Sequence, residues 1–223
     1  MDARRVPAAV LAAAGDRQGG AVEVAARAAD GLLEVAADPP LLEEAVAVLR
    51  AGQPARAPIW HLARAARAPD PAAALADLRR RLDADADAAV TAATAWLLHH
   101  LADNPGPVAT VSHSSLVDRV LTQLGPEAHA GPPAPVVGVV GADAVGPRAI
   151  LNAVGTRELA AWVPTLVVAT AIKLVPGEVF DRLAGPGFEV VPLDGLAAVV
   201  VGGEVVAPAE AGRRAAAVSG SRP

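Results

Sequence analysis

The sequence predicts an α/β protein with a helical N-terminal domain followed by a reduced Rossmann-like domain built on a parallel sheet. Two observations support this prediction. Up to residue 103 the apolar residues recur at helical spacing. After the Asn-Pro-Gly-Pro segment at 104–107, short apolar runs alternate with helical patterns, which indicates a parallel sheet covered on both faces. We therefore expect a helical domain at 1–104, a sheet domain at 105–212 and a disordered tail at 213–223.

Four helical segments are expected in the first domain. The pattern at 20–37 stops at Asp38-Pro39-Pro40, the pattern at 41–52 ends at a glycine, and the pattern at 58–68 begins with a proline, which suits a first helical turn. The segment at 70–103 is either one long helix or a broken pair. We interpret its arginines and aspartates at 79–87 as a solvated face with opposite-charge pairs. A calcium loop would also need glycine and carbonyl groups that this segment lacks.

The second domain contains the expected strands. They lie at 108–112, 135–140 and 165–170, with edge strands at 188–193 and 197–207. Helices are expected between them at 115–124 and 149–162, and a loop rich in proline and glycine at 125–135.

Composition excludes several classes of protein. The 223 residues are 53% hydrophobic, which is enough for a real core, and the net charge of -5 leaves no basic surface for nucleic acid. The absence of cysteine excludes disulfides, thiolate metal sites and cysteine catalysis. The longest apolar runs fall short of a membrane span, and Asp2 argues against a signal peptide. We expect a cytoplasmic protein with no membrane partner, no cofactor and no metal.

Polar residues gather where three of the predicted strands end. They are the Ser-His-Ser-Ser run at 112–115, Asp143, and Thr170 with Lys173. Ligands of such sheets bind beyond the carboxyl ends of the strands. Asp143 stands out because a carboxylate in a tight glycine-bounded turn is costly unless it is used. Its other possible roles are to cap the next helix or to pair with Arg148. Lys173, the only lysine, could reach a phosphate.

The serine-rich loop opens a helix, and its hydroxyls and free backbone N–H groups would suit a phosphate or a carboxylate. Ordinary capping by Ser114 or Ser115 explains the same residues, and on this loop alone we favour capping. Asn152 and Thr156 are expected one turn apart on the helix after Asp143. Gly155 between them allows another backbone or a ligand to approach closely.

Five motifs follow one another along the chain. They are the helix beginning "GGAVEVAARAADGLL", the segment "PARAPIWHLARA", the strand–loop–helix "GPVATVSHSSLVDRVL", the pair "GADAV" and "LNAVGTRELA", and the run "VPTLVVATAIKLVP". In this order they resemble the translation initiation factor 2B alpha/beta/delta-type family, which also contains methylthioribose-1-phosphate isomerase and ribose-1,5-bisphosphate isomerase. Together they cover most of the chain.

The resemblance implies roles for the residues that match. Asp143 corresponds to the proton-transfer acid of the isomerases, Arg56 to a phosphate-binding arginine, and Lys173 to a lysine at a later strand end. The predicted catalytic residues are thus Asp143 and Ser114. The predicted substrate-binding residues are Arg17, Gly20, Arg56, His113, Ser115, Asn152, Gly155, Thr156 and Lys173.

Several positions depart from the family pattern. Ser114 stands where the isomerases have a catalytic cysteine, and an alkyl hydroxyl without a base beside it hardly exchanges protons near neutral pH. Ala153 replaces a lysine, and Gly19 replaces an arginine for which Arg17 is a stand-in. About a dozen residues after Leu124 occupy the place of two strand–helix units of the family, which implies a smaller sheet and a more open pocket.

These matches and departures support three hypotheses. We favour a non-catalytic protein, similar to initiation factor 2B, that binds a sugar phosphate or a nucleotide or acts as an assembly module. The alternative is an aldose–ketose isomerase that acts on a phosphorylated pentose with Asp143 as acid and base. The third hypothesis is a degenerate scaffold that binds no ligand. The resemblance also implies a homodimer formed through the C-terminal domain.

Overall fold

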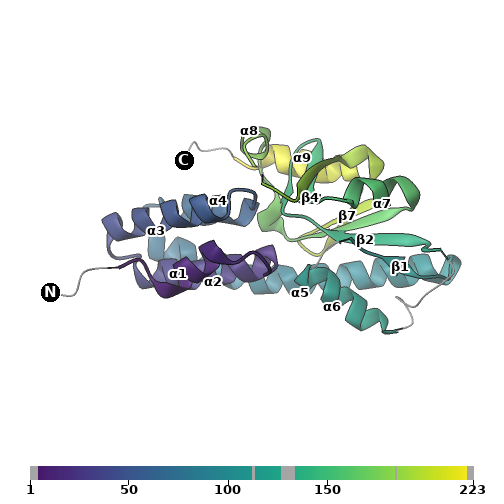
Figure 1. Cartoon of the computed structure of the whole chain (residues 1–223), viewed down its shortest axis with the longest axis horizontal. Helices are drawn as coiled ribbons and strands as arrows, with labels where there is room; N and C mark the ends of the chain where they lie inside the picture. Colours follow the sequence, from purple (N-terminus) through teal and green to yellow (C-terminus); the bar gives the residue numbers. More distant parts are fainter. Residues whose placement is uncertain (1–4, 112–113, 127–133, 184, 220–223) are drawn as a thin grey trace.

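The protein is an elongated molecule with helices at one end and an α/β region at the other (Figure 1). This computed structural model describes residues 5–111, 114–126, 134–183 and 185–219. In the described residues no helix is long and apolar enough to cross a membrane. The α/β class and the helical N-terminal region predicted from the sequence are confirmed.

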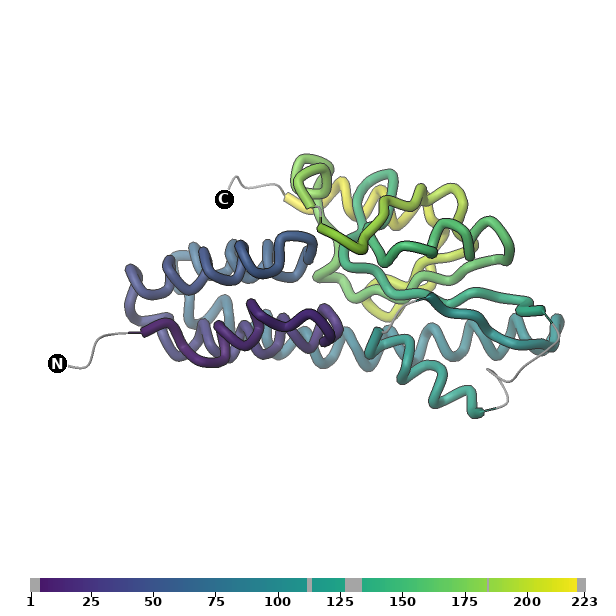
Figure 2. Tube along the Cα trace, viewed as in Figure 1, coloured from purple at the N-terminus to yellow at the C-terminus, as the bar shows by residue number. Residues whose placement is uncertain are grey.

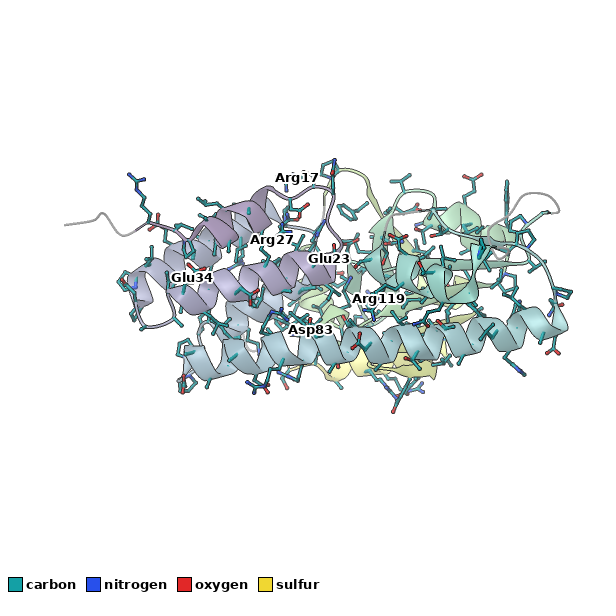
Figure 3. The ribbon with its side chains drawn as sticks, turned by 90° about the horizontal axis from the view of Figure 1, so that it is seen from below. Arg17, Glu23, Arg27, Glu34, Asp83 and Arg119 are labelled. Atoms are coloured by element: carbon teal, nitrogen blue, oxygen red, sulfur yellow. The ribbon has the colours of Figure 1, made fainter. Side chains whose placement is uncertain are left out.

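The helical end contains four short helices and one long one. They are α1 (Ala8–Gly15), α2 (Ala21–Glu34), α3 (Pro39–Gly52), α4 (Ala57–Ala65) and α5 (Pro71–Asp103). The last segment is therefore a single helix of 33 residues, begun by Asp70, whose carboxylate accepts the Ala73 N–H at 3.0 Å. It extends from the helical end to the sheet (Figure 3). Fully buried leucines of α2 to α5, among them Leu32, Leu49, Leu62 and Leu75, form the core here.

The main sheet has the order β1-β2-β5-β7-β8. Its strands are β1 (Val108–Ala109), β2 (Val137–Gly141), β5 (Thr165–Ala169), β7 (Ala198–Val201) and β8 (Glu204–Val206). The first four are parallel and β8 is antiparallel at the edge. The predicted parallel sheet is thus confirmed, although β1 is shorter than the run expected at 108–112. The segment expected at the edge, 197–207, forms an inner parallel strand, β7, as well as β8, and of these two only β8 lies at the edge.

Alternate residues of the central strands enter two separate cores, because successive side chains of a strand point to opposite faces. Val139 packs with α5 and with α6 (Ser115–Leu124) on one face. Val140 packs with α7 (Thr156–Trp162) and with α9 (Pro208–Ala217) on the other face. Helices on both faces explain why every residue of β2 and β5 is buried.

A second sheet corrects the expected helix at 149–162. Only its later part is helical, as α7, whereas Ala149–Ala153 form strand β4. This strand lies between β3 (Ala144–Val145) and β6 (Phe188–Pro192), with Ile150 opposite Val191. The apolar residues of β4 are buried by this pairing, which periodicity in one segment cannot reveal. The strand expected at 188–193 is therefore an edge of this sheet and not of the main one.

The expected disorder from residue 213 is wrong as far as 217. Helix α9 continues to Ala217, with Ala211 and Ala215 buried against the main sheet. Glu210 forms ion pairs with Arg213 and Arg214 one turn later. The domain boundary near residue 104 stays a prediction.

A candidate ligand-binding cleft

A cleft of about 910 Å³ lies where the helical end meets the carboxyl ends of β2 and β5. Figure 2 shows that the turns before α2 and before α4 lie at the end of the helical region that faces the sheet. Seven of the predicted site residues line this cleft: Arg17, Gly20, Arg56, Ser114, Asp143, Asn152 and Lys173. Residues separated by more than 150 positions are thus brought to one site by the fold.

Three described residues of the predicted set, Ser115, Gly155 and Thr156, are not part of the lining. The remaining predicted residue, His113, lies outside the described residues. Thr156 instead holds a lining residue in place, because its Oγ1 accepts a hydrogen bond from Asn152 Nδ2 at 2.9 Å and donates one to the Ala153 carbonyl at 2.7 Å. Asn152 lies on a strand and not on the expected helix, and Gly155 supplies the left-handed turn that joins the two residues, with φ of 99°.

Asp143 lies in the turn after β2 and is fixed by its backbone. Its N–H donates to the Leu151 carbonyl at 2.8 Å, and its carbonyl accepts from the Ala57 N–H at 3.0 Å. This second bond ties the sheet to the first turn of α4. The ion-pair partner of the carboxylate within the described chain is Arg56, with Nε 3.8 Å from Oδ1, and not Arg148 as the alternative interpretation would have it.

Arg56 directly precedes α4 and reaches across the cleft. Its Nη1 donates to the Gly19 carbonyl at 2.9 Å, and the residue is only 9% exposed. A guanidinium has five donors, so these contacts leave several for a phosphate or carboxylate.

Lys173 ends a short 3-10 turn (Ala171–Lys173) that follows β5, and it is 5% exposed. Its Nζ donates to the Ala142 carbonyl, next to Asp143. Burial lowers the pKa of Lys173 to about 8, which the Asp143 carboxylate opposes and the Arg56 guanidinium reinforces. The amine is therefore charged at neutral pH but loses its proton far more readily than an exposed lysine.

The loop before α2, residues 16–20, is held by hydrogen bonds within the loop and by one from Gln53. The Asp16 carboxylate accepts the N–H groups of Gln18 at 2.9 Å and Gly19 at 2.7 Å, which holds the pKa of Asp16 below its usual value. Gln53, a buried residue that sequence reasoning missed, donates from Nε2 to the Asp16 carbonyl at 2.6 Å. A glutamine in an Ala-Gly-Gln-Pro turn carries no pattern that predicts such a role.

Helix α2 thus begins at the cleft. Gly20 is its N-cap residue, and Glu23 accepts the Gly20 N–H at 3.1 Å. The backbone N–H groups of its first turn have no partner within the helix, and the helix dipole places partial positive charge there. An anion in the cleft would be stabilised at this position.

The two serines that open α6 also lie against glycines. Ser114 is the N-cap residue, but its side chain forms no capping hydrogen bond, so capping does not explain its hydroxyl. A Cβ at Gly141 would lie 2.8 Å from Ser114 Oγ, and one at Gly20 would lie 2.7 Å from Ser115 Oγ. A side chain at either glycine would therefore displace the hydroxyl of the neighbouring serine.

Comparison of the sequence alone finds neither a matching family model nor a matching curated protein. The fold, however, is shared with solved structures. Translation initiation factor eIF-2B from Pyrococcus horikoshii OT3 matches with a TM-score of 0.69 at 16% identity, over 91% of this chain and 96% of that chain. A chain of the tetrameric eIF2B-beta2-delta2 complex from C. thermophilum matches with a TM-score of 0.67 at 14% identity, over 92% and 91%. The 5-methylthioribose 1-phosphate isomerase from Pyrococcus horikoshii OT3 matches with a TM-score of 0.53 at 14% identity, over 96% and 88%. The chain has the fold of these proteins, as the resemblance predicted.

A second, smaller hollow of about 470 Å³ lies between α4, α5 and the turn at Ala171–Lys173. His61 lies on its wall, with Nε2 2.8 Å from the Leu174 carbonyl. Burial lowers the pKa of His61 to about 4, although the Leu174 carbonyl opposes this shift, and Arg64 and Arg81 add to it. The ring is therefore neutral at physiological pH.

The neutral His61 predicts a loss of stability in acid. Its pKa is lower in the folded chain than the ordinary 6.5, so the unfolded chain binds more protons between pH 6.5 and 4, and stability falls as the pH falls through that window. The expected contribution is about 3 kcal/mol. Urea unfolding measured from pH 7 to pH 4 should show a shallower loss for His61→Gln, whose amide can still donate to Leu174. Equal slopes for the two proteins would contradict this role.

Proposed function

We propose that the cleft binds a small phosphorylated ligand, a sugar phosphate or a nucleotide, and that the protein is a non-catalytic binding or regulatory module of the initiation factor 2B type. The observation that carries the proposal is the convergence of Arg56, Lys173 and the start of α2 around one carboxylate, Asp143. Such a set suits a ligand with an anionic end and a hydroxyl-bearing end.

The two ends of the ligand would meet different groups. The N–H groups of the first α2 turn and the remaining Arg56 donors suit the phosphate. The Asp143 carboxylate accepts hydrogen bonds and suits sugar hydroxyls. Asn152 lines the same wall and can donate or accept. A volume of about 910 Å³ is ample for a phosphopentose or a nucleoside monophosphate.

Ser114 supports a non-catalytic role. In the described chain no titratable side chain hydrogen-bonds to its hydroxyl, so nothing there would activate it for proton transfer. The structural likeness to initiation factor subunits is compatible with this role, and family membership is part of the proposal.

The proposal is tested by thermal unfolding with a panel of ligands: ribose 5-phosphate, methylthioribose 1-phosphate, AMP and, as the unphosphorylated control, ribose. At 100 times the dissociation constant a bound ligand stabilises the native state by about 2.7 kcal/mol. We expect at least one phosphorylated compound to raise the melting temperature and ribose to leave it unchanged. The absence of a shift throughout the panel, or an equal shift with ribose, would contradict the proposal.

The isomerase alternative is favoured by one observation: Asp143 pairs with Arg56 and lines the same cleft as Lys173. A carboxylate there could move a proton between adjacent carbons of an open-chain sugar, while Arg56 and Lys173 stabilise the developing oxyanion. Asp143→Asn is expected to abolish turnover of methylthioribose 1-phosphate or ribose 1,5-bisphosphate, followed by NMR. An enzyme that retains full turnover in this variant would rule out the alternative, and an inactive wild-type protein would favour the binding module.

We also propose a homodimer. Large apolar side chains on neighbouring elements of the α/β region are exposed: Trp162 at 75%, Val154 at 63% and Val190 at 45%. A second copy that covers them would remove this apolar surface from water. Light scattering on the eluted protein should give twice the chain mass, and Trp162→Glu should give the mass of a single chain.

A further inference from the structure

Lys173 is the one lysine of the chain, whereas arginine supplies the other positive side chains. A primary amine differs from a guanidinium in its chemistry as well as its shape. A neutral amine adds to an aldehyde and forms an imine, whereas a guanidinium is always protonated and does not react in this way. The chain therefore holds its single reactive side-chain amine in the wall of the cleft.

The surroundings of this amine make the loss of its proton easier than it is for an exposed lysine. Nζ donates to the Ala142 carbonyl, and no described carboxylate lies within ion-pair distance of it. Asp143 acts on it only through space, as Arg56 does with the opposite effect. The amine is buried, so an amine without its proton avoids the cost of a desolvated charge.

We propose that Lys173 forms an imine with phosphorylated aldehydes bound in the cleft, an inference that rests on the proposed function. The Lys173 nitrogen attacks the aldehyde carbon, and the carbonyl oxygen gains a proton to give a carbinolamine. Loss of water then forms the C=N bond, in which the departing hydroxyl takes up one proton and the nitrogen releases one. Asp143 lines the same cleft and is the carboxylate assigned to carry this proton. No oxidant or reductant is needed, and hydrolysis reverses the reaction.

The phosphate gives the reaction its selectivity. Arg56 and the start of α2 line the same cleft as Lys173, so an anionic group bound there holds a tethered aldehyde near the amine. The ligand class is therefore an open-chain aldehyde that carries a phosphate. The aldehyde form of an aldose phosphate belongs to it.

The test is reductive trapping with pyridoxal 5'-phosphate and sodium cyanoborohydride, followed by mass spectrometry. The N-terminal amine is an internal control within the same sample. Cleavage at arginines places Lys173 in one peptide, 158–182, because Arg157 and Arg182 flank it. We expect one phosphopyridoxyl group on that peptide, formed about tenfold or more faster than with pyridoxal, which lacks the phosphate.

Two variants and a competing ligand test whether the label forms on Lys173 and inside the cleft. Lys173→Arg should lose the label on peptide 158–182 and keep the N-terminal label. Asp143→Asn should slow labelling of Lys173 about tenfold or more because the reaction loses its acid and base, even though loss of the carboxylate lowers the pKa of Lys173 and so favours the neutral amine. Ribose 5-phosphate should protect Lys173 but not the N-terminus.

The outcomes separate this inference from the proposed function. Label confined to the N-terminus, in a protein that ribose 5-phosphate stabilises, would overturn the imine while the binding function stands. The same labelling in a protein that no phosphorylated compound of the panel stabilises would overturn both the imine and the binding function. Equal labelling of Lys173 by pyridoxal and its phosphate would also overturn the inference, because the phosphate would then not direct the reaction.

Discussion

Replacement of Lys173 by methionine should raise the free energy of unfolding at pH 7 by about 2 kcal/mol while it weakens ligand binding. The reason is the cost of a charge that burial holds away from water. Methionine has a similar volume and length, so it should fill the site without leaving a large cavity. Such a result would show that Lys173 lowers the stability of the folded protein and contributes to ligand binding in return.

The pH dependence gives this prediction a second, independent readout. The pKa of Lys173 is about 8 in the folded chain and 10.5 as the ordinary value, so the unfolded chain binds more protons between these limits. Wild-type stability should therefore rise as the pH increases from 8 toward 10.5, whereas Lys173→Met should lack this rise. Urea unfolding at pH 7, 8, 9 and 10 measures both effects. Lys173→Arg keeps the charge and is the control, and a less stable methionine variant at pH 7 would contradict the argument.

Much of the fold could be predicted because its patterns are local. Helix α6 begins and ends where the sequence places it, at Ser115 and Leu124, since a serine-rich start and a following glycine mark both ends. The parallel strands are uniform apolar runs. The second sheet was missed because the residues of β4 fit a helix equally well. Their conformation is decided by β6, more than 30 residues later in the chain.

Site residues could be predicted where a single charged side chain stands out from its local sequence. Asp143 and Lys173 are unusual in their local sequence, and both line the cleft. Gln53 was missed because its role depends on the loop at Asp16, which lies beside it only in the folded chain. The alternative in which Asp143 pairs with Arg148 fails for the same reason, since Arg148 is near in sequence but Arg56 is near in space.

Arg56→Gln should weaken binding of a phosphorylated ligand about 100-fold or more, because a buried charged donor to an anion is worth several kcal/mol. The loop before α2 should keep its position without the Arg56–Gly19 bond, since Asp16 and Gln53 brace it as well. The loss should therefore appear in the dissociation constant measured by calorimetry and much less in the unfolding temperature of the free protein. Arg64→Gln is the matched control. Arg64 lies on α4, the helix that Arg56 precedes, but it lines the second hollow and donates to the Ser219 carbonyl instead.

Arg56→Gln should also change the chemistry of its neighbour. The Arg56 guanidinium contributes to the low pKa of Lys173, so removal of that charge should raise this pKa above about 8. Reductive trapping of Lys173 followed against pH reports the change directly, because only the neutral amine reacts. The midpoint of the rate should move to higher pH in Arg56→Gln and stay in place in Arg64→Gln. Unchanged midpoints in both variants, together with unchanged affinity, would show that Arg56 and Lys173 do not share one binding site.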